Sequence, residues 1–322
     1  MNIKKQEQLN EAFQKALQEE NLLLVKILVA QGAEINSEDL KFATQKGNID
    51  IIKYLVKQGA DIHAWNDESL RCAAEKGHLE VVKYLVKQGA NVHAQDDYAL
   101  RFSAMGEYLD VIKYLIDQGA DIHVENDWPL RIASERGNID IIKYLVEQGA
   151  DIHAQNDCAL KWATSNGHLE VVKYLLENDA DVHANNNNWV FKYAAYNGQL
   201  EIVKYLVEKG ADIHADNDDA LRMAAQKGNL EIVKYLIEKG ADIHFENNWA
   251  LQIASERGHI EVIKYFLFDC KMEIKQETKD LLIEKNQNKT LELIKKRDLL
   301  FKLNQNLENN DSINKIRKSV KI

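Results

Sequence analysis

A period of 30 residues governs this sequence. The stretch HLEVVKYLVKQGANVHAQDDYALR, which begins at His78, returns in edited form as NLEIVKYLIEKGADIHFENNWALQ from Asn229. The tyrosine of a Lys-Tyr pair marks each unit and recurs every 30 residues, with a single step of 31, at Tyr54, Tyr84, Tyr114, Tyr144, Tyr174, Tyr205, Tyr235 and Tyr265. Self-similarity at a fixed period of this size indicates a repeat array, in which each unit packs against its neighbours. We therefore expect one continuous stack rather than the two globular domains that a length of 322 residues would suggest.

A single unit, taken from Asp67 to Asp97, predicts two helices and a connector. The apolar residues of the first helix are spaced i, i+3, i+4, at Leu70, Ala73 and Ala74. Asp67 is the expected N-cap of this helix, because a carboxylate can accept hydrogen bonds from the free amides of the first turn. Gly77 is expected to end the helix in the left-handed conformation. A second helix with two apolar faces follows, and Gly89 separates it from the connector.

The unit resembles the ankyrin repeat. The resemblance is carried by the GHLEVVKYL run at residues 77–85 and by GADIH, which stands where that family has GADVN, and it extends over roughly residues 10–300. The family's TPLH is reduced to ALR or SLR and survives in part only as Trp128-Pro129-Leu130-Arg131. The period is 30 residues rather than the family's 33 or so, and the connector carries the deficit. The resemblance implies an all-α solenoid of helix–turn–helix repeats with shortened connectors, acting as a non-catalytic protein–protein interaction scaffold.

The style of the repeat is also similar to the ankyrin repeat proteins of giant DNA viruses of amoebae. That likeness implies an intracellular, cytoplasmic location, including the cytoplasm of a host cell, and host proteins as partners. The chain is expected to be a monomer.

The two ends of the repeat pattern differ from its middle. The first unit is polar and irregular, as expected of a terminal repeat that turns one face to water. Beyond residue 270 the consensus words vanish, while Leu281-Leu282-Ile283 and Leu291-Leu293-Ile294 keep a two-helix pattern. We therefore expect an N-terminal capping repeat at 1–36, eight repeats at 37–270, divergent C-terminal capping helices at 271–302 and a polar, flexible tail at 303–322.

Seven of the ten histidines recur at one position of the connector: His63, His93, His123, His153, His183, His214 and His244. Zinc holds nitrogen ligands at about 2.0–2.1 Å, whereas packed helices lie about 8–10 Å apart. Successive histidines are therefore too widely spaced to share a metal ion, and the pattern predicts a structural ladder that hydrogen-bonds the connector backbone. In the related family this position is an asparagine that resembles the target of protein asparaginyl hydroxylases, so such a modification stays open.

A second ladder is cationic and follows the leucine of the first helix, at Lys41, Arg71, Arg101, Arg131, Lys161, Lys192 and Arg222. An Asp or Glu opens the second helix in every unit from Asp50 to Glu261. Charges of opposite sign repeating at fixed positions predict ion pairs between adjacent repeats.

Several function classes are disfavoured. A net charge of −10 argues against binding along a phosphate backbone, so no nucleic-acid partner is expected. No apolar run approaches the roughly 18 residues of a membrane span, so no membrane partner is expected either. The sequence has no phosphate-binding loop, GxSxG or HExxH motif, and we predict no catalytic residue, no cofactor and no metal. The three cysteines are far apart, which is typical of reduced intracellular thiols.

The positions that vary between units are the candidates for partner binding, since constant positions maintain the stack. One variable position follows the expected cap and the other follows the cationic ladder. Trp and Tyr dominate the energetically important sites of protein interfaces, and in ankyrin arrays the first helix and connector line the concave face. We therefore predict a partner-binding concave surface, with these aromatic residues filling gaps between helices as the alternative: Tyr98, Trp128, Trp189 and Trp249 at the first position, and Phe102, Trp162 and Tyr193 at the second. The alternative function is an adaptor whose C-terminal helices recruit a second machine, for example a ubiquitin ligase.

Overall fold

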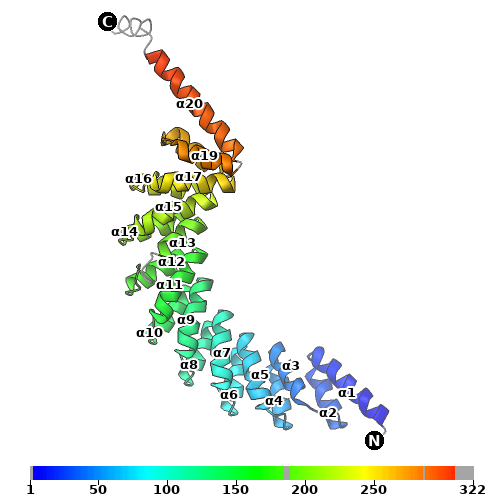
Figure 1. Cartoon of the computed structure of the whole chain (residues 1–322). Coiled ribbons are helices and arrows are strands. Elements are labelled where there is room, and N and C mark those ends of the chain that lie inside the picture. Colours follow the sequence, from blue (N-terminus) through cyan, green and yellow to red (C-terminus); the bar gives the residue numbers. More distant parts are fainter. Residues whose placement is uncertain (1–2, 184–188, 286, 309–322) are drawn as a thin grey trace, which may run out of the picture. The chain divides into compact units, whose positions relative to one another are not determined.

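The computed structural model describes residues 3–183, 189–285 and 287–308, and within these ranges every regular element is a helix (Figure 1). The chain forms two compact units. The first comprises Met1–Ala163 together with Glu177–Ala180, and the second comprises Thr164–Leu176 together with Asp181–Ile322.

The first unit contains α1 (Ile3–Gln18), α2 (Leu22–Ala30), α3 (Ser37–Lys46), α4 (Ile49–Lys57), α5 (Ala64–Glu75), α6 (Leu79–Lys87), α7 (Ala94–Met105), α8 (Leu109–Asp117), α9 (Val124–Arg136) and α10 (Ile139–Glu147). The division between the units falls within α11 (Ala154–Asn166) and α12 (Leu169–Glu177). The second unit continues with α13 (Trp189–Asn197), α14 (Leu200–Glu208), α15 (Ala215–Lys227), α16 (Leu230–Glu238), α17 (Phe245–Arg257), α18 (Ile260–Lys264), the π-helix η1 (Tyr265–Asp269), α19 (Gln276–Glu284) and α20 (Asn288–Glu308).

Helices of the same kind stack on one another within each unit. In the first unit α3, α5, α7 and α9 pack in sequence as first helices of their repeats, and α4, α6 and α8 pack behind them as second helices. In the second unit α13, α15 and α17 form the equivalent series. The leucine of each first helix and the branched residues of each second helix make the core, and Leu100, Ile112 and Leu115 are fully buried. The predicted all-α, helix–turn–helix architecture is confirmed.

The turn between the two helices of a repeat also follows the prediction. Gly77 has φ +73° and takes the left-handed conformation that ends the helix. In the repeat where the glycine stands one place early, Glu107 occupies the left-handed position with φ +64°. Asp179 replaces the second glycine of its repeat and has φ +71°. The connector that follows contains one asparagine more than the others, which accounts for the single step of 31, and its residues 184–188 lie outside the described residues.

The connector differs from the prediction. Trp65, Asn66 and Asp67 are all left-handed, with φ of 49°, 55° and 55°, so the right-handed turns of α5 start only after Asp67. The same three positions are left-handed in the equivalent connectors, at 95–97, 125–127, 155–157, 216–218 and 246–248. We call each of these three-residue segments a left-handed connector turn. Asp67 belongs to this turn, and its carboxylate bonds elsewhere, so its assignment as an N-cap was wrong.

The two ends of the chain carry helix pairs, α1 with α2 and α19 with α20. Helix α20 continues to Glu308, six residues beyond the predicted limit of the C-terminal capping helices at residue 302. The rest of the predicted tail, residues 309–322, lies outside the described residues. Within the described ranges, every helix is too short or too polar to span a lipid bilayer.

Candidate partner-binding surfaces

A buried aspartate closes each connector of the first unit. Asp127 is 4% exposed, and its Oδ1 accepts a hydrogen bond from His123 Nδ1 at 3.0 Å. The same oxygen accepts from the backbone amide of Asp151, at 2.7 Å, in the connector of the next repeat. Equivalent pairs join Asp67 to His63 and Asp97 to His93. The aspartate therefore ties its own histidine to the following repeat.

The histidine ladder is structural, and it acts through this aspartate. Five histidines lie four residues before the aspartate that they contact and keep their side chains more than half exposed, as His123 does. The prediction that the histidine side chain bonds the connector backbone was wrong. The ring bonds the carboxylate, and the carboxylate accepts from a backbone amide of the next connector. Among the described residues, no group of three or more His, Cys, Asp or Glu side chains is arranged to hold a metal ion.

Three arginines of the cationic ladder, Arg71, Arg101 and Arg131, hold left-handed connector turns of the first unit. Arg131 is 8% exposed and donates from Nε to Asn126 O at 3.1 Å and from Nη2 to Glu125 O at 2.8 Å. Its Nη1 donates to Gln155 Oε1 of the next connector at 3.1 Å. Arg101 makes the same two backbone bonds in its own connector. These guanidinium groups donate to carbonyls of the left-handed turn, and such backbone acceptors need a partner where water is excluded.

The prediction of ion pairs between repeats holds for two lysines and is wrong for the arginines: Arg71, Arg101 and Arg131 bind carbonyls, and Arg222 pairs with Asp219 of its own helix. Lys41 pairs with Glu68 of the next repeat at 3.0 Å, and Lys192 pairs with Asp216 at 2.7 Å. The Glu68 carboxylate raises the pKa of Lys41. Four of the acids that open second helices instead pair with a lysine three residues later in the same helix, as Glu80 does with Lys83 at 2.9 Å; the other three are Glu201, Glu231 and Glu261.

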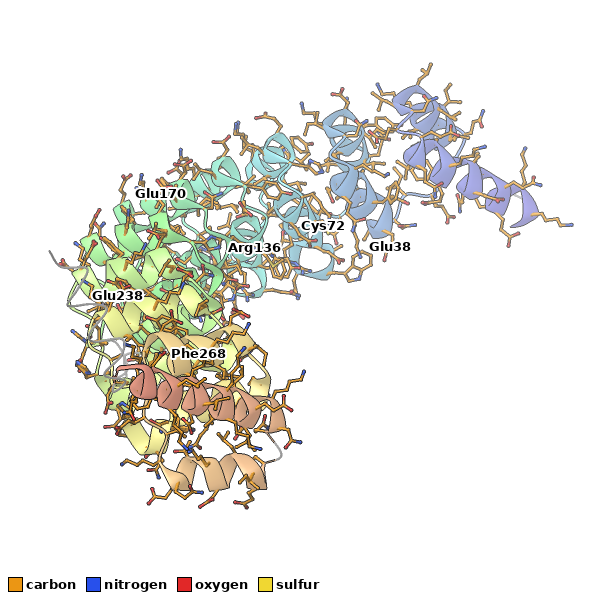
Figure 2. The ribbon with its side chains drawn as sticks, turned by 90° about the horizontal axis from the view of Figure 1, so that it is seen from above. Glu38, Cys72, Arg136, Glu170, Glu238 and Phe268 are labelled. Carbon is orange, nitrogen blue, oxygen red and sulfur yellow. The ribbon has the colours of Figure 1, made fainter. Side chains whose placement is uncertain are left out.

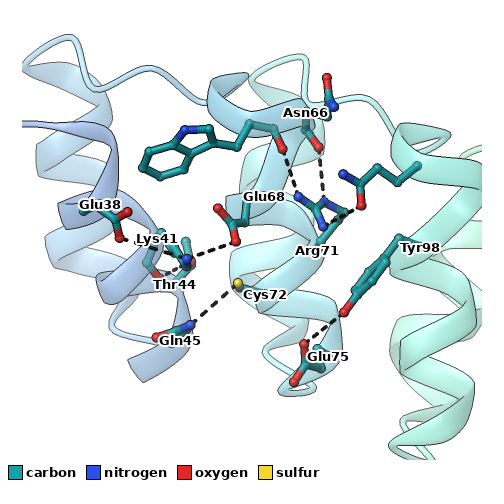
Figure 3. A network of polar contacts seen from close by, with 12 residues as sticks. Glu38, Lys41, Thr44, Gln45, Asn66, Glu68, Arg71, Cys72, Glu75 and Tyr98 are labelled. Atoms are coloured by element: carbon teal, nitrogen blue, oxygen red, sulfur yellow. Dashed lines mark hydrogen bonds and ion pairs between the residues drawn. The ribbon is translucent and has the colours of Figure 1, made fainter.

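Three of the predicted aromatic residues form one cluster in the first unit. The rings of Tyr98 and Phe102 stack with centroids 3.8 Å apart, and Trp128 of the next repeat lies 6.3 Å from Phe102. Arg71 lies over the Tyr98 ring at 5.0 Å, and Tyr98 Oη donates to Glu75 at 3.4 Å (Figure 3). Burial, reinforced by the Glu75 carboxylate, raises the pKa of the Tyr98 hydroxyl. All three residues are half-buried, so each keeps part of its surface exposed.

Two further tryptophans of the first unit lie under cations. Arg131 lies 5.7 Å from the Trp162 ring, and Lys41 lies 5.7 Å from the Trp65 ring. Trp65 is 48% exposed and was missed by the sequence argument. It is the first residue of a left-handed connector turn. The other described turns begin with Gln, Glu or Asp, so this position also varies between repeats. Comparing that position between units could have found it.

The second unit has its own aromatic group. Trp189 and Tyr193 stack at 3.9 Å, and Tyr196, which was not predicted, lies 6.1 Å from Tyr193. Trp249 is 38% exposed and lies under Arg222 at 4.5 Å.

All seven predicted residues thus lie in first helices and retain exposed surface. The structure brings Tyr98, Phe102 and Trp128 together in one unit, and Trp189 and Tyr193 together in the other.

Cys72 lies beside the first cluster but has no reactive environment. It is buried, and Gln45 Nε2 donates to its sulfur at 3.8 Å (Figure 3). Burial raises the pKa of the Cys72 thiol, which keeps it protonated and weakly nucleophilic. The three cysteines are free thiols.

Comparison with known families agrees with this geometry. A family model described as ankyrin repeats (3 copies) matches residues 13–96, 100–186, 131–217 and 191–280, which together make up most of the chain. A search of the curated proteins finds no match.

Proposed function

Because this chain belongs to the ankyrin repeat family, whose repeats are generally protein-interaction modules, we propose that it is a non-catalytic scaffold that binds a partner protein. The proposed contact surface is the row of first helices, which is the concave side of an ankyrin array. The aromatic residues at its variable positions act as anchors.

The Tyr98–Phe102–Trp128 cluster is the observation that carries this proposal. The connectors on either side are fixed by buried Asp–His and arginine contacts, so the aromatic rings stand on a rigid support. Rigid aromatic side chains lose little conformational entropy on binding, and Tyr and Trp are enriched at interface hot spots. The second unit repeats the arrangement with Trp189 and Tyr193.

An affinity pull-down tests the proposal. The wild-type chain and the triple variant Trp128→Ala/Trp189→Ala/Trp249→Ala are compared on an amoebal cell lysate, with captured proteins identified by mass spectrometry. The matched control removes three half-buried tyrosines from second helices, Tyr84→Ala/Tyr114→Ala/Tyr235→Ala. Circular dichroism verifies that each variant is folded. We expect a partner that the wild type and the control capture and the tryptophan variant loses. Equal capture by all three proteins would move the site away from the first helices.

We also propose a source, a cellular location and an oligomeric state for this chain. The style of repeat supports a giant-virus protein that acts on host proteins in the cytoplasm as a monomer. Size-exclusion chromatography with light scattering is expected to give the mass of one chain. We further propose that residues 1–36 and 271–302 act as caps, so that removing either segment lowers the solubility of the remaining repeats.

An adaptor is the second candidate function, and exposed apolar residues on α20 favour it. Leu299, Leu300, Phe301 and Leu303 are all exposed, although a helix that served only as a cap would bury its apolar face and turn a polar one to water. In this version the repeats hold one protein while the C-terminal helices hold another.

A further inference from the structure

A groove with apolar walls lies at the C-terminal end of the second unit. It runs between η1, together with the segment that follows it, and the last helix, α20, and its volume is about 760 Å³. Phe268 of η1 lies beside α20 (Figure 2). The apolar lining comes from both sides: Leu267, Phe268, Met272 and Ile274 from one, and Leu300 and Phe301 from α20.

The α20 side of this groove is unusually open. Among the described residues, nine large hydrophobic side chains are exposed, and four of them lie between Leu299 and Leu303. Phe301 is 63% exposed. The C-terminal half of α20 extends beyond α19 (Figure 1), and the apolar side chains named above stay exposed within the described part of the chain. Exposed apolar side chains that gather in one place mark an interaction site rather than ordinary surface.

The rim of the groove is basic, although the whole chain carries a net charge of −10. Four basic residues line it, Lys271, Lys275, Lys279 and Arg297, against the two acids Glu273 and Asp298. Asp298 already accepts from Lys279 at 3.2 Å and from Arg297 Nε at 3.1 Å. Within the described part of the chain, no hydrogen bond or ion pair engages the ammonium groups of Lys271 and Lys275.

We propose that this groove binds an acidic amphipathic helix of a partner protein. An apolar trough accepts the apolar face of a helix, and the lysines at its rim complement carboxylates on the flanks of that helix. The proposal rests on the adaptor candidate and uses none of the aromatic residues of the first helices. The chain's own residues 309–322 are a poor occupant by charge, since they carry Lys315, Arg317, Lys318 and Lys321 against the single acid Asp311.

The test is selection from a phage-displayed library of helical peptides on the full chain. The charge-reversed variant Lys271→Glu/Lys275→Glu is selected in parallel. We expect the wild type to enrich peptides with apolar residues at i, i+3 or i+4 and i+7 flanked by Asp and Glu, and the variant to lose this acidic preference. Fluorescence anisotropy with one enriched peptide then compares two variants of α20. Phe301→Ala is expected to weaken binding at least tenfold, and Leu299→Ala, which removes an equally exposed side chain outside the groove, less than twofold.

Several results would overturn the proposal. One is a selection that enriches no peptide or enriches basic peptides. Another is an equal loss of peptide affinity for Phe301→Ala and Leu299→Ala. A third is binding of the chain to anionic phosphatidylserine vesicles in place of peptide. A dimer in light scattering that Phe301→Ala dissolves would assign the groove to a second copy of the chain. A tenfold gain in peptide affinity on deleting 309–322 would assign it to the chain's own C-terminus. The tryptophan triple variant should bind the peptide normally, which separates this test from that of the aromatic surface.

Discussion

The repeats place left-handed backbone at two kinds of site, and each site is made tolerable in a different way. At helix ends the residue is usually glycine, such as Gly119 with φ +93°, which has no side chain to clash. In the connectors three consecutive residues with side chains are left-handed, such as Glu125, Asn126 and Asp127. Left-handed backbone costs about 1–2 kcal/mol for each residue that carries a Cβ.

The difference shows where the hydrogen bonds of the repeat are needed. A glycine turn requires no outside support, whereas the connector turn is held by the Arg131 guanidinium and by the Asp127 carboxylate. The left-handed connector turn at 246–248 in the second unit has the same backbone conformation but is held by neutral side chains. There Gln252 Nε2 makes a single bond to Asn247 O at 2.8 Å, and Asn248 accepts from His244 at 2.9 Å while its amide donates to Thr278 Oγ1 at 3.3 Å.

Removing the arginine should break the connector most severely. Arg131→Ala loses three hydrogen bonds from a nearly buried charged group, two of them to carbonyls of the connector turn. We expect the free energy of unfolding to fall by about 3 kcal/mol, since bonds to charged groups contribute about 1.5–3 kcal/mol each and part of the loss is recovered by water. Urea unfolding followed by circular dichroism measures this. The matched variant Gln252→Ala loses one neutral bond and should lose about 1 kcal/mol. Equal losses for the two variants would contradict this explanation of the arginine ladder.

Removing the aspartate should have the next largest effect. Asp127→Ala leaves the Asp151 amide without its acceptor, and an unsatisfied buried donor costs about 1–3 kcal/mol. We expect a loss of about 2 kcal/mol, together with faster hydrogen exchange of the Asp151 amide. His123→Ala is the control, because its half-exposed ring can be replaced by water at the carboxylate. Unchanged exchange at Asp151 would show that the connector does not depend on this bond.

The sequence predicted the helices well and the connectors poorly, for a physical reason. Apolar spacing such as Leu70, Ala73 and Ala74 reports directly on a buried helix face, and glycine reports directly on a left-handed helix end. Asp67 carries no such direct signal, because Asp before a helix fits both an N-cap and a left-handed turn. Only its constant spacing from His63 and Arg71 could have favoured the second. The aromatic positions were found by their variation, but the stacking of Tyr98 on Phe102 depends on side-chain packing that spacing does not fix.

Adding a Cβ at a glycine turn isolates the backbone strain itself. A Cβ on Gly119 would meet nothing within 4 Å, so Gly119→Ala introduces no steric contact with a neighbour. The variant should lose about 1 kcal/mol in urea unfolding, from the left-handed backbone alone. No change in the unfolding midpoint would indicate that this helix end relaxes to another conformation, and the contrast with the connector would then be weaker.

The converse change, Glu107→Gly, should give the smallest effect and the opposite sign. Glu107 is left-handed at φ +64° without the support that the connector residues receive, so glycine relieves strain there. Two terms reduce the gain: glycine has more freedom to lose on folding, and the exposed bond from Asn138 Nδ2 to Glu107 Oε2, at 3.1 Å, disappears. We expect a net gain of about 0.5 kcal/mol in urea unfolding. Glu107→Ala is the control, because it removes the same side-chain bond and keeps the strain, so it should not stabilise the chain. A loss of stability for Glu107→Gly equal to that of Glu107→Ala would mean that the Asn138 bond, rather than the backbone, decides the stability of this turn.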